Sequence, residues 1–466
     1  MNKISSDKPI VVHVVDSGIR DILWRIFLSV ELANEGITSV FGTGQRFDKF
    51  MNNSSNTLVF GRLPRNEGFS GLNDPLLDLA KKNNTSFLYL HDEGGYYSKS
   101  VYRGSVIRSH ILQCALDTTV KKIFFWGELQ KRIASKVITN KKVRDKFVVV
   151  GAPRFDLFHK PYVDIINKMN DATEKNLNFQ KYILVCTRGG GINRAKNHPS
   201  PLSDKIRNNI KFGTKSLIEV ERLMFGKWAK QSIDAIMLIE AISYVSIKFP
   251  EESFVVRPHP GESLTFYEDA FDKYKNIKIS NNSDLSLAIK SSKLVVGNDC
   301  TSGLEAILGG REFINFRPFG GFNEEFSVHG LNKLGQIVKD KKSLVSRVNA
   351  SINSTLNTNK VTEKLHSQRH IVKNLYSPSI PTIREHIINY CNNSKHLGSY
   401  LFINGTIKQR IYSAIKKLIR KNEQYINLNY SHDEIKIIVD IMVEEKFINN
   451  DVRINYKDGV IVVSPS

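Results

Sequence analysis

Residues Ser292 to Phe316 have the sequence SKLVVGNDCTSGLEAILGGREFINF. A short apolar run is followed by a polar turn, a segment with helical spacing of its apolar residues, a pair of glycines and a second apolar run. Glycines directly after a helical pattern predict that the helix ends there. A strand, a helix and a strand in this order predict a βαβ unit, because parallel strands need a long crossover between them.

The same alternation recurs along the chain in two blocks, which the polar stretch DATEKNLNFQ (residues 171–180) separates. This pattern predicts an α/β protein with two Rossmann-like domains that face a cleft, with ligands beyond the carboxyl ends of the strands. In the first block we expect strands at 9–16, 38–43, 56–62, 86–90, 121–127 and 146–154, and helices at 22–36 and near 75–82. In the second block we expect a strand that runs into a glycine loop at 181–191, a strand that runs into a proline-rigid loop at 253–262, a strand at 276–280 and a helix near 227–248.

We place an N-terminal acceptor domain at residues 1–170, a donor domain at 181–390 and a basic extension at 391–466. An apolar stripe beside a basic face over residues 407–421 predicts an amphipathic helix. The extension then continues with a predicted helix at 433–446 and a hairpin at 453–463, whose turn is Asp458–Gly459.

The chain is strongly basic, with 67 Lys and Arg against 46 Asp and Glu and a formal net charge of +21. Such a surface attracts nucleic acid, anionic lipid or phosphorylated substrates; a genome rich in Lys, Asn and Ile codons is the alternative origin of the charge. The four cysteines lack CxxC spacing, which argues against a disulfide framework and a structural zinc site. Without a signal peptide or a long apolar run, the sequence predicts a cytoplasmic protein with only peripheral membrane contact.

Thr301 and Ser302 lie where the strand of the opening stretch turns into its helix. A helix N-terminus has free N–H groups and a partial positive charge, and therefore favours phosphate. The alternative is an N-cap, with Glu305 completing a capping box. Because this turn follows a strand, we favour a diphosphate or nucleoside-monophosphate site.

Two other loops that follow expected strands carry cations. In RPHPGE, the prolines hold Arg257 and His259 on a rigid loop that suits phosphate or carboxylate, with an incidental surface turn as the alternative. In CTRGGGINR, Arg188 is a candidate anion contact, with a flexible glycine loop as the alternative. This loop has neither GxGxxG nor GxxxxGK[ST] spacing, which excludes a dinucleotide or P-loop site.

Carboxylates follow several strands of the first block: Asp16, Asp92, Glu93 and Glu128. Asp16 also fits an N-cap, and in the same turn Arg20 fits a surface pair with Asp21. Adjacent residues leaving a strand point to opposite sides, so we expect one of Asp92 and Glu93 to do chemistry. The chain has no DxD, HExxH or GxSxG motif, so we expect neither a metal site nor a serine nucleophile.

Over roughly residues 9–320 the chain resembles the bacterial surface carbohydrate biosynthesis proteins, because it has in order the motifs VVDSGIRDI, HDEGG, FFWGELQK, GAPRFD, RPHPGE and TSGLEAILGG. That family is similar to the retaining β-Kdo glycosyltransferases of GT-B fold, which use CMP-Kdo. The last two motifs also occur in capsule transferases, teichoic-acid polymerases and sugar-nucleotide epimerases. The chain departs from the family at Asp16, where Glu is more usual, at DEGG in place of DEEG, and at TRGGG in place of a Thr-Asn pair, which leaves the donor sugar open.

The resemblance implies a metal-independent transferase without a cofactor, in which Asp92 is the nucleophile and Asp16 the base or orienting residue for the acceptor. Glu93 and Glu128 are the alternates. Arg20 is implied as a contact of the sugar carboxylate or phosphate. The implied donor-binding residues are Thr187, Arg188, Arg257, His259, Thr301, Ser302 and Glu305.

The expected partners are a nucleotide-sugar donor, a glycan or lipid-linked glycan acceptor, and the anionic inner face of the cell membrane. The alternatives are a different donor such as a CMP-nonulosonate, a UDP-sugar epimerase, and a non-catalytic nucleic-acid-binding protein. The positive charge is dispersed and the sequence lacks RNP, KH and helix-turn-helix patterns, which argues against specific nucleic-acid binding.

Overall fold

The structure is a computed structural model of the 466-residue chain. It describes the following residues, to which all structural statements refer: 2–6, 8–15, 18–43, 54–61, 81–90, 115, 117–173, 181–190, 192–193, 217–321, 327, 330–353, 365–393, 398–402, 432–445, 452–457 and 460–465.

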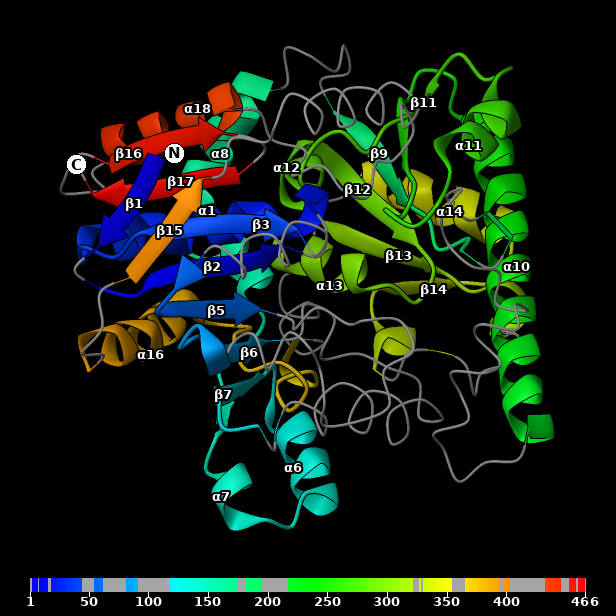
Figure 1. The fold of residues 1–466 in the computed structure, drawn as a ribbon. Coiled ribbons are helices and arrows are strands. Elements are labelled where there is room, and N and C mark those ends of the chain that lie inside the picture. The colour runs from blue at the N-terminus through cyan, green and yellow to red at the C-terminus, as the bar shows by residue number, and fades with distance from the viewer. Residues whose placement is uncertain are drawn as a thin grey trace, which may run out of the picture. The chain divides into compact units, whose positions relative to one another are not determined.

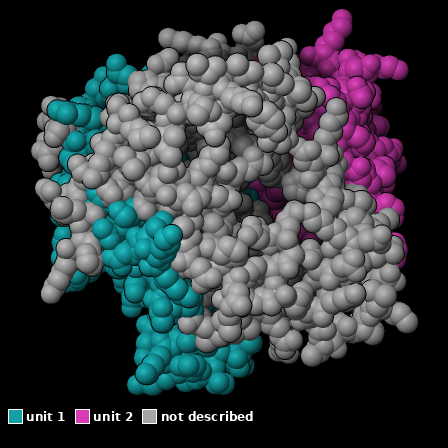
Figure 2. All heavy atoms as spheres, in the orientation of Figure 1, with its two compact units in different colours: residues 1–94, 110–156, 378–466 teal, residues 95–109, 157–377 magenta. Residues whose placement is uncertain are grey.

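The chain forms two compact units, which Figure 2 colours separately. Unit 1 comprises residues 1–94, 110–156 and 378–466, and unit 2 comprises residues 95–109 and 157–377. This division differs from the predicted boundaries in three ways, the first being that residues 378–390, expected in the donor domain, are part of unit 1. The extension at 391–466 is part of unit 1, because its described strands hydrogen-bond into the sheets of that unit. Helix α8 (Tyr162–Thr173) is part of unit 2, where it packs against α12 (Leu285–Ser291).

Unit 1 contains an eight-stranded sheet with the order β16-β17-β3-β2-β5-β6-β7-β8 (Figure 1). Neighbouring strands from β3 to β8 are parallel, whereas β17 pairs antiparallel with both β16 and β3. The predicted C-terminal hairpin is therefore confirmed, and it extends the first sheet. The strands are β2 (Ile10–Val15), β3 (Ser39–Thr43), β5 (Thr57–Gly61), β6 (Ser86–Leu90), β7 (Val120–Phe125), β8 (Phe147–Val149), β16 (Val452–Lys457) and β17 (Val460–Pro465).

Helix α1 (Gly18–Asn34) of unit 1 packs against β2, β17 and α16 (Ile380–Asn392). The Asp156 carboxylate accepts the backbone N–H groups of Ser379 at 2.7 Å and Ile380 at 2.6 Å, which fixes the start of α16 within unit 1. The other elements of unit 1 are α6 (Glu128–Val137), α7 (Lys141–Arg144), α18 (His432–Glu444) and a small sheet in the order β1-β15-β4, from β1 (Asn2–Ser6), β15 (Gly398–Phe402) and β4 (Ser54–Ser55).

Unit 2 contains a six-stranded parallel sheet with the order β11-β10-β9-β12-β13-β14. Numbered by their order along the chain, these strands follow the arrangement 3-2-1-4-5-6 of a Rossmann fold. The strands are β9 (Tyr182–Cys186), β10 (Phe254–Arg257), β11 (Ile277–Ile279), β12 (Ser292–Gly297), β13 (Glu312–Phe316) and β14 (Gln336–Val338).

Alternate residues of these strands face two layers of helices. Ile183 and Val185 belong to a buried cluster with residues of α10 (Leu217–Lys248), α11 (Leu264–Phe271) and α14 (Lys341–Ile352). On the opposite face, the Tyr182 hydroxyl donates to the Ala288 carbonyl of α12. The sheet is thus covered on both sides, as its nearly continuous apolar strands require.

The structure confirms the strands predicted from the sequence in both blocks. Helix α10 begins at Leu217, about ten residues before the predicted start, and Figure 1 shows it as a long helix. The predicted helix at 407–421 and most of the one near 75–82 lie outside the described residues. None of the described helices combines the length and the apolar character needed to cross a membrane.

Candidate functional site

The order of the unit 2 sheet places the ends of β9 and β12 side by side, although they are more than 100 residues apart in the chain. Gly297, the last residue of β12, is in register with Cys186, the last residue of β9. The chain leaves these two neighbouring strands to opposite sides of the order, and ligands of such sheets bind outside the carboxyl ends at this point. Thr187 and Arg188 therefore lie next to the turn that leads from β12 into α13 (Thr301–Leu308).

Helix α13 does not begin with the capping box considered from the sequence. Its N-cap is Cys300, which makes no side-chain capping hydrogen bond, and Thr301 and Ser302 form the first turn. Ser302 and Glu305 are buried and Thr301 is half-buried. Gly303 lies so close to the Phe313 ring of β13 that a Cβ atom there would overlap with it. The capping-box alternative is wrong, and the N-terminal turn of α13 lies at the strand ends.

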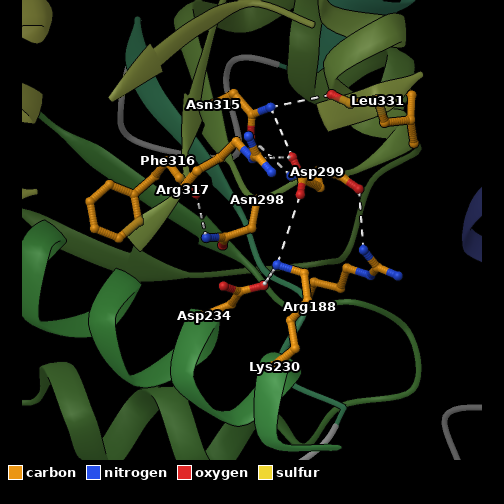
Figure 3. Close-up of polar contacts among 9 residues, drawn as sticks. All are labelled: Arg188, Lys230, Asp234, Asn298, Asp299, Asn315, Phe316, Arg317 and Leu331. Atoms are coloured by element: carbon orange, nitrogen blue, oxygen red, sulfur yellow. Dashed lines mark hydrogen bonds and ion pairs between the residues drawn. The ribbon is translucent and has the colours of Figure 1, made fainter. Parts of the chain in front are cut away.

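Asp299 is the centre of the polar contacts in this turn (Figure 3). Its backbone N–H donates to Asn315 Oδ1 at 3.0 Å, and Asn315 Nδ2 donates back to Asp299 Oδ1 at 3.1 Å. Arg317 Nε lies 3.2 Å from the same carboxylate oxygen, and Arg188 donates to the Asp299 carbonyl at 3.2 Å. Residues that follow β9, β12 and β13 are thus joined at one place.

Lys230 of α10 also reaches this cluster, and its side chain is only 4% exposed. It pairs with Asp234 at 2.9 Å and lies 3.9 Å from Asp299 Oδ2. Burial raises the pKa of Asp234 above its usual value, although Lys230 opposes this shift. Figure 3 shows the Lys230 nitrogen between the two carboxylates. The described part of this edge therefore holds buried charges of both signs.

Glu262, the last residue of the RPHPGE stretch, connects this loop to the TRGGG loop through hydrogen bonds. Its Oε2 atom accepts the Thr187 hydroxyl at 2.5 Å and the Tyr267 hydroxyl at 2.8 Å, and the His259 backbone N–H donates to the Thr187 hydroxyl oxygen at 3.3 Å. Burial raises the pKa of Glu262 despite these hydrogen bonds. A Cβ atom at Gly189 would lie 2.6 Å from the Tyr267 oxygen, so the first glycine of TRGGG is needed for close packing.

The RPHP loop holds its two candidate residues differently. Arg257 is buried and donates from Nη2 to the Ser283 carbonyl at 2.6 Å. His259 is exposed, and its Nδ1 atom accepts the Gly261 N–H at 3.1 Å. This hydrogen bond requires an unprotonated Nδ1, so the ring proton is on Nε2, where it serves as a donor.

The candidates in unit 1 are described only in part. Asp16, Asp92 and Glu93 lie outside the described residues. Glu128 is exposed as the first residue of α6. Arg20 pairs with Asp21, with Arg20 Nη2 at 3.0 Å from Asp21 Oδ2, but the pair is not the surface pair considered from the sequence, because the Asp21 side chain is only 1% exposed.

The structure therefore brings together seven predicted donor residues at one edge of the unit 2 sheet: Thr187, Arg188, Arg257, His259, Thr301, Ser302 and Glu305. It adds three charged residues that sequence reasoning missed. Lys230 and Asp234 have the i,i+4 spacing of an ordinary surface ion pair, which hides their burial. Arg317 directly follows β13, the same position after a strand that marks Arg188 in the sequence.

This arrangement suits a phosphate or carboxylate ligand, because cationic side chains, a histidine donor and the N-terminal turn of a helix lie at the same strand ends. Among the described residues there is no group of three or more His, Cys, Asp or Glu residues with the arrangement of a metal site.

No protein-family model matches the chain, and neither does any curated protein. The chain is similar to the solved structure of the wall teichoic acid polymerase TagF soaked with CDPG, at 11% identity and a TM-score of 0.52, over 84% of this chain and 89% of that one. It is also similar to UDP-GlcNAc 2-epimerase from Neisseria meningitidis bound to UDP-GlcNAc, at 15% identity and a TM-score of 0.46, over 82% of this chain and 99% of that one. The chain has a GT-B-like α/β fold with two parallel Rossmann-like sheets, which confirms the predicted fold class.

Proposed function

We propose that this protein is a glycosyltransferase that takes a sugar from a nucleotide donor bound at the carboxyl edge of the unit 2 sheet. The observation that carries the proposal is the convergence of Arg188, Arg257, His259 and the start of α13 around the ends of β9, β10 and β12. Cations and free N–H groups in this position stabilise the charge that develops on a leaving phosphate. The similarity to a polymerase soaked with CDPG fits this assignment at the level of the fold.

The finer proposal is a retaining transfer of a Kdo-like ulosonic acid from its CMP derivative to a glycan of the bacterial surface. It rests on the ordered motifs of the sequence, from VVDSGIRDI to TSGLEAILGG. The acceptor is a growing or lipid-linked glycan, and the formal charge of +21 favours contact with an anionic membrane surface where such acceptors lie.

The proposed chemistry has two displacements. The Asp92 carboxylate attacks the anomeric carbon, the bond to the CMP phosphate breaks, and the departing charge is taken by Arg257, His259 and the α13 turn. The acceptor hydroxyl then attacks the glycosyl-enzyme intermediate and passes its proton to Asp16, which frees Asp92. Two inversions give net retention, and Glu93 and Glu128 are the alternate carboxylates.

Titration calorimetry with CMP, CDP and UDP tests the donor site. We expect CMP to bind in preference to CDP and UDP at about 0.15 M salt, because charges that are partly buried are screened less than surface charges. A UDP-sugar epimerase predicts preference for UDP, and a donor of another nucleotide class predicts preference for UDP or CDP. A CMP-nonulosonate donor predicts preference for CMP, as the ulosonate does. An oligonucleotide that binds at this salt, together with no binding of any nucleotide, would show that the protein is a nucleic-acid-binding protein.

Intact-mass measurement with the donor tests the nucleophile. Asp92→Asn is expected to lower turnover by about 10³-fold or more and to prevent formation of the glycosyl-enzyme adduct. Glu93→Gln is the matched control, since it alters the neighbouring carboxylate in the same motif. Near-normal turnover by Asp92→Asn would exclude Asp92 as the nucleophile, and loss of turnover in Glu93→Gln alone would assign the role to Glu93.

A further inference from the structure

We infer that Asp299 is a positioning residue of the proposed donor site. It holds three cationic side chains as one anion subsite for the donor phosphate: Arg188, Lys230 and Arg317. The inference rests on the function proposed above and adds two binding residues to it, Lys230 and Arg317.

The contacts of Asp299 reach each cation through a different atom. Its carbonyl oxygen accepts from Arg188, its Oδ1 atom faces Arg317, and its Oδ2 atom faces Lys230. Arg188 follows β9, Arg317 follows β13 and Lys230 lies on α10. The three cations therefore belong to different elements that are far apart in the sequence. Figure 3 shows that their side chains converge on Asp299.

The backbone of Asp299 is itself fixed in an unusual conformation. Its φ angle is +35°, in a region that residues other than glycine rarely adopt and that Asp and Asn tolerate best. The two hydrogen bonds with Asn315 hold this turn, and Asn315 Nδ2 also donates to the Leu331 carbonyl at 3.2 Å. The turn is therefore anchored before any ligand binds, which is the condition for a preorganised site.

The charges of the cluster favour an added anion. Three cationic side chains face two carboxylates, Asp299 and Asp234, so the ionised cluster keeps one net positive charge. Asp234 contacts only Lys230 among these cations as an ion pair in the described residues, whereas Asp299 reaches all three. The two carboxylates thus differ in role although they carry the same charge.

Inorganic pyrophosphate and CMP are the probes, with affinity measured by calorimetry at two salt concentrations. Asp299→Asn keeps the shape, the tolerance for positive φ and the carbonyl that accepts from Arg188, but removes the charge that holds Lys230 and Arg317. We expect it to weaken binding of both probes by about tenfold or more, although it makes the cluster more positive. Asp234→Asn makes the same change of charge, and we expect it to tighten binding because it releases Lys230 from its counter-ion.

The opposite signs of the two effects decide the inference. If Asp299→Asn tightens or leaves unchanged the binding of pyrophosphate, Asp299 acts only as a counter-charge and the inference is wrong. Equal weakening by both variants would also overturn it, because it would mark a general loss of structure. Asp340→Asn, which changes the N-cap of α14 outside the cluster, is the control for loss of one carboxylate, and we expect no change in binding.

A second variant covers poor folding of Asp299→Asn. The double substitution Lys230→Gln with Asp234→Asn removes the buried ion pair without leaving one charge alone, so we expect a folded protein. Its binding of pyrophosphate should weaken and depend less on salt, and unchanged binding would remove Lys230 from the subsite. Failure of the wild-type protein to bind pyrophosphate would overturn the inference that these cations form an anion subsite. Pyrophosphate binding without binding of any nucleotide contradicts the proposed function alone.

Discussion

Unit 1 and unit 2 contain buried polar side chains in different places. In unit 1, His13 lies inside β2, 3.2 Å from the Ser29 hydroxyl and stacked on Phe41. In the same unit, Arg25 is fully buried in α1 and lies over the Trp24 ring. In unit 2, charged side chains gather at the carboxyl ends of the strands. Arg188, Asp299 and Arg317 follow β9, β12 and β13, and Lys230 reaches Asp299 from α10.

The difference shows which buried charges are structural. A polar group within a strand or helix is surrounded by fixed neighbours, and its partners in unit 1 come from adjacent parts of the core. A polar group beyond a strand end lies where parallel sheets bind ligands, and its protein partners there also fix its direction. We therefore assign the former to stability and the latter to binding, and four predictions test this division.

The largest expected effect is that of Gly335→Ala, directly before β14, because Gly335 packs against Phe313, whose ring lies against Gly303 of α13. Gly335 has a φ angle of +70°, and a Cβ atom there would overlap with the Phe313 carbonyl oxygen. Strain and overlap together are expected to cost about 4 kcal/mol, measured by denaturant unfolding and by hydrogen exchange in unit 2. Gly310→Ala is the matched control, with a φ angle of +72° but open space around the Cβ position, and we expect about 1 kcal/mol. Equal effects would show that the overlap is relieved without cost.

A smaller effect is expected for Glu262→Ala, because it leaves the buried hydroxyls of Thr187 and Tyr267 without their acceptor. The free energy of unfolding should fall by about 3 kcal/mol, and nucleotide binding should weaken because both loops lose their tie. Glu262→Gln retains an acceptor oxygen and should lose less than half as much. If the folded Glu262→Ala variant keeps full nucleotide affinity, the hydrogen bonds of Glu262 do not position the nucleotide-binding residues.

The two units should respond to acid in opposite directions. Burial, with a contribution from Arg25, lowers the pKa of His13 well below 6.5, so protons favour the unfolded state and its contribution to stability is lost as pH falls below about 6.5. Burial raises the pKa values of Glu262 and Asp234, so protons favour the folded state and stability gains as pH falls towards the unfolded values of 4.5 and 3.8.

This contrast is measured as the stability difference between wild type and each variant over pH 7 to 4. For His13→Phe the advantage of the wild type should shrink on acidification, by at most about 1.4 kcal/mol per pH unit. For Glu262→Gln it should grow. The same sign in both series would contradict the assigned protonation states.

The smallest effects are expected for two ion pairs of similar exposure, one in each unit and both away from the carboxyl ends of the strands. Arg384 pairs with Glu31 at 3.1 Å in unit 1, and Lys293 pairs with Glu252 at 2.6 Å in unit 2. Arg384→Met and Lys293→Met should each cost about 0.5 kcal/mol and leave nucleotide affinity unchanged. A marked loss of nucleotide affinity in Lys293→Met would mean that charge anywhere in unit 2 supports binding, so the strand ends would have no special role.

Much of the candidate site could be predicted because its polar residues directly follow strands. A strand is recognisable in the sequence as a short apolar run. Arg188, Arg257, His259 and Ser302 were found in this way. Lys230 could not be found, since a lysine and an aspartate four residues apart on a helix are indistinguishable from a surface pair in sequence. The position of Asp16, Asp92 and Glu93 stays a prediction, as these residues lie outside the described part of the chain.

The sequence by itself determined the strands and helices, because apolar spacing, turn residues and terminal glycines act over a few residues. The tertiary structure decided which strands pair and which side chains become neighbours. Pairing of β9 with β12 brings Arg188 beside Asp299, and pairing of β17 with β3 adds the C-terminal hairpin to the first sheet. These choices depend on packing between segments far apart in the chain, which the local pattern does not encode. The stretch from Ser292 to Phe316 thus specified its own strand, turn and helix, but only the folded sheet supplied the cations that surround its aspartate.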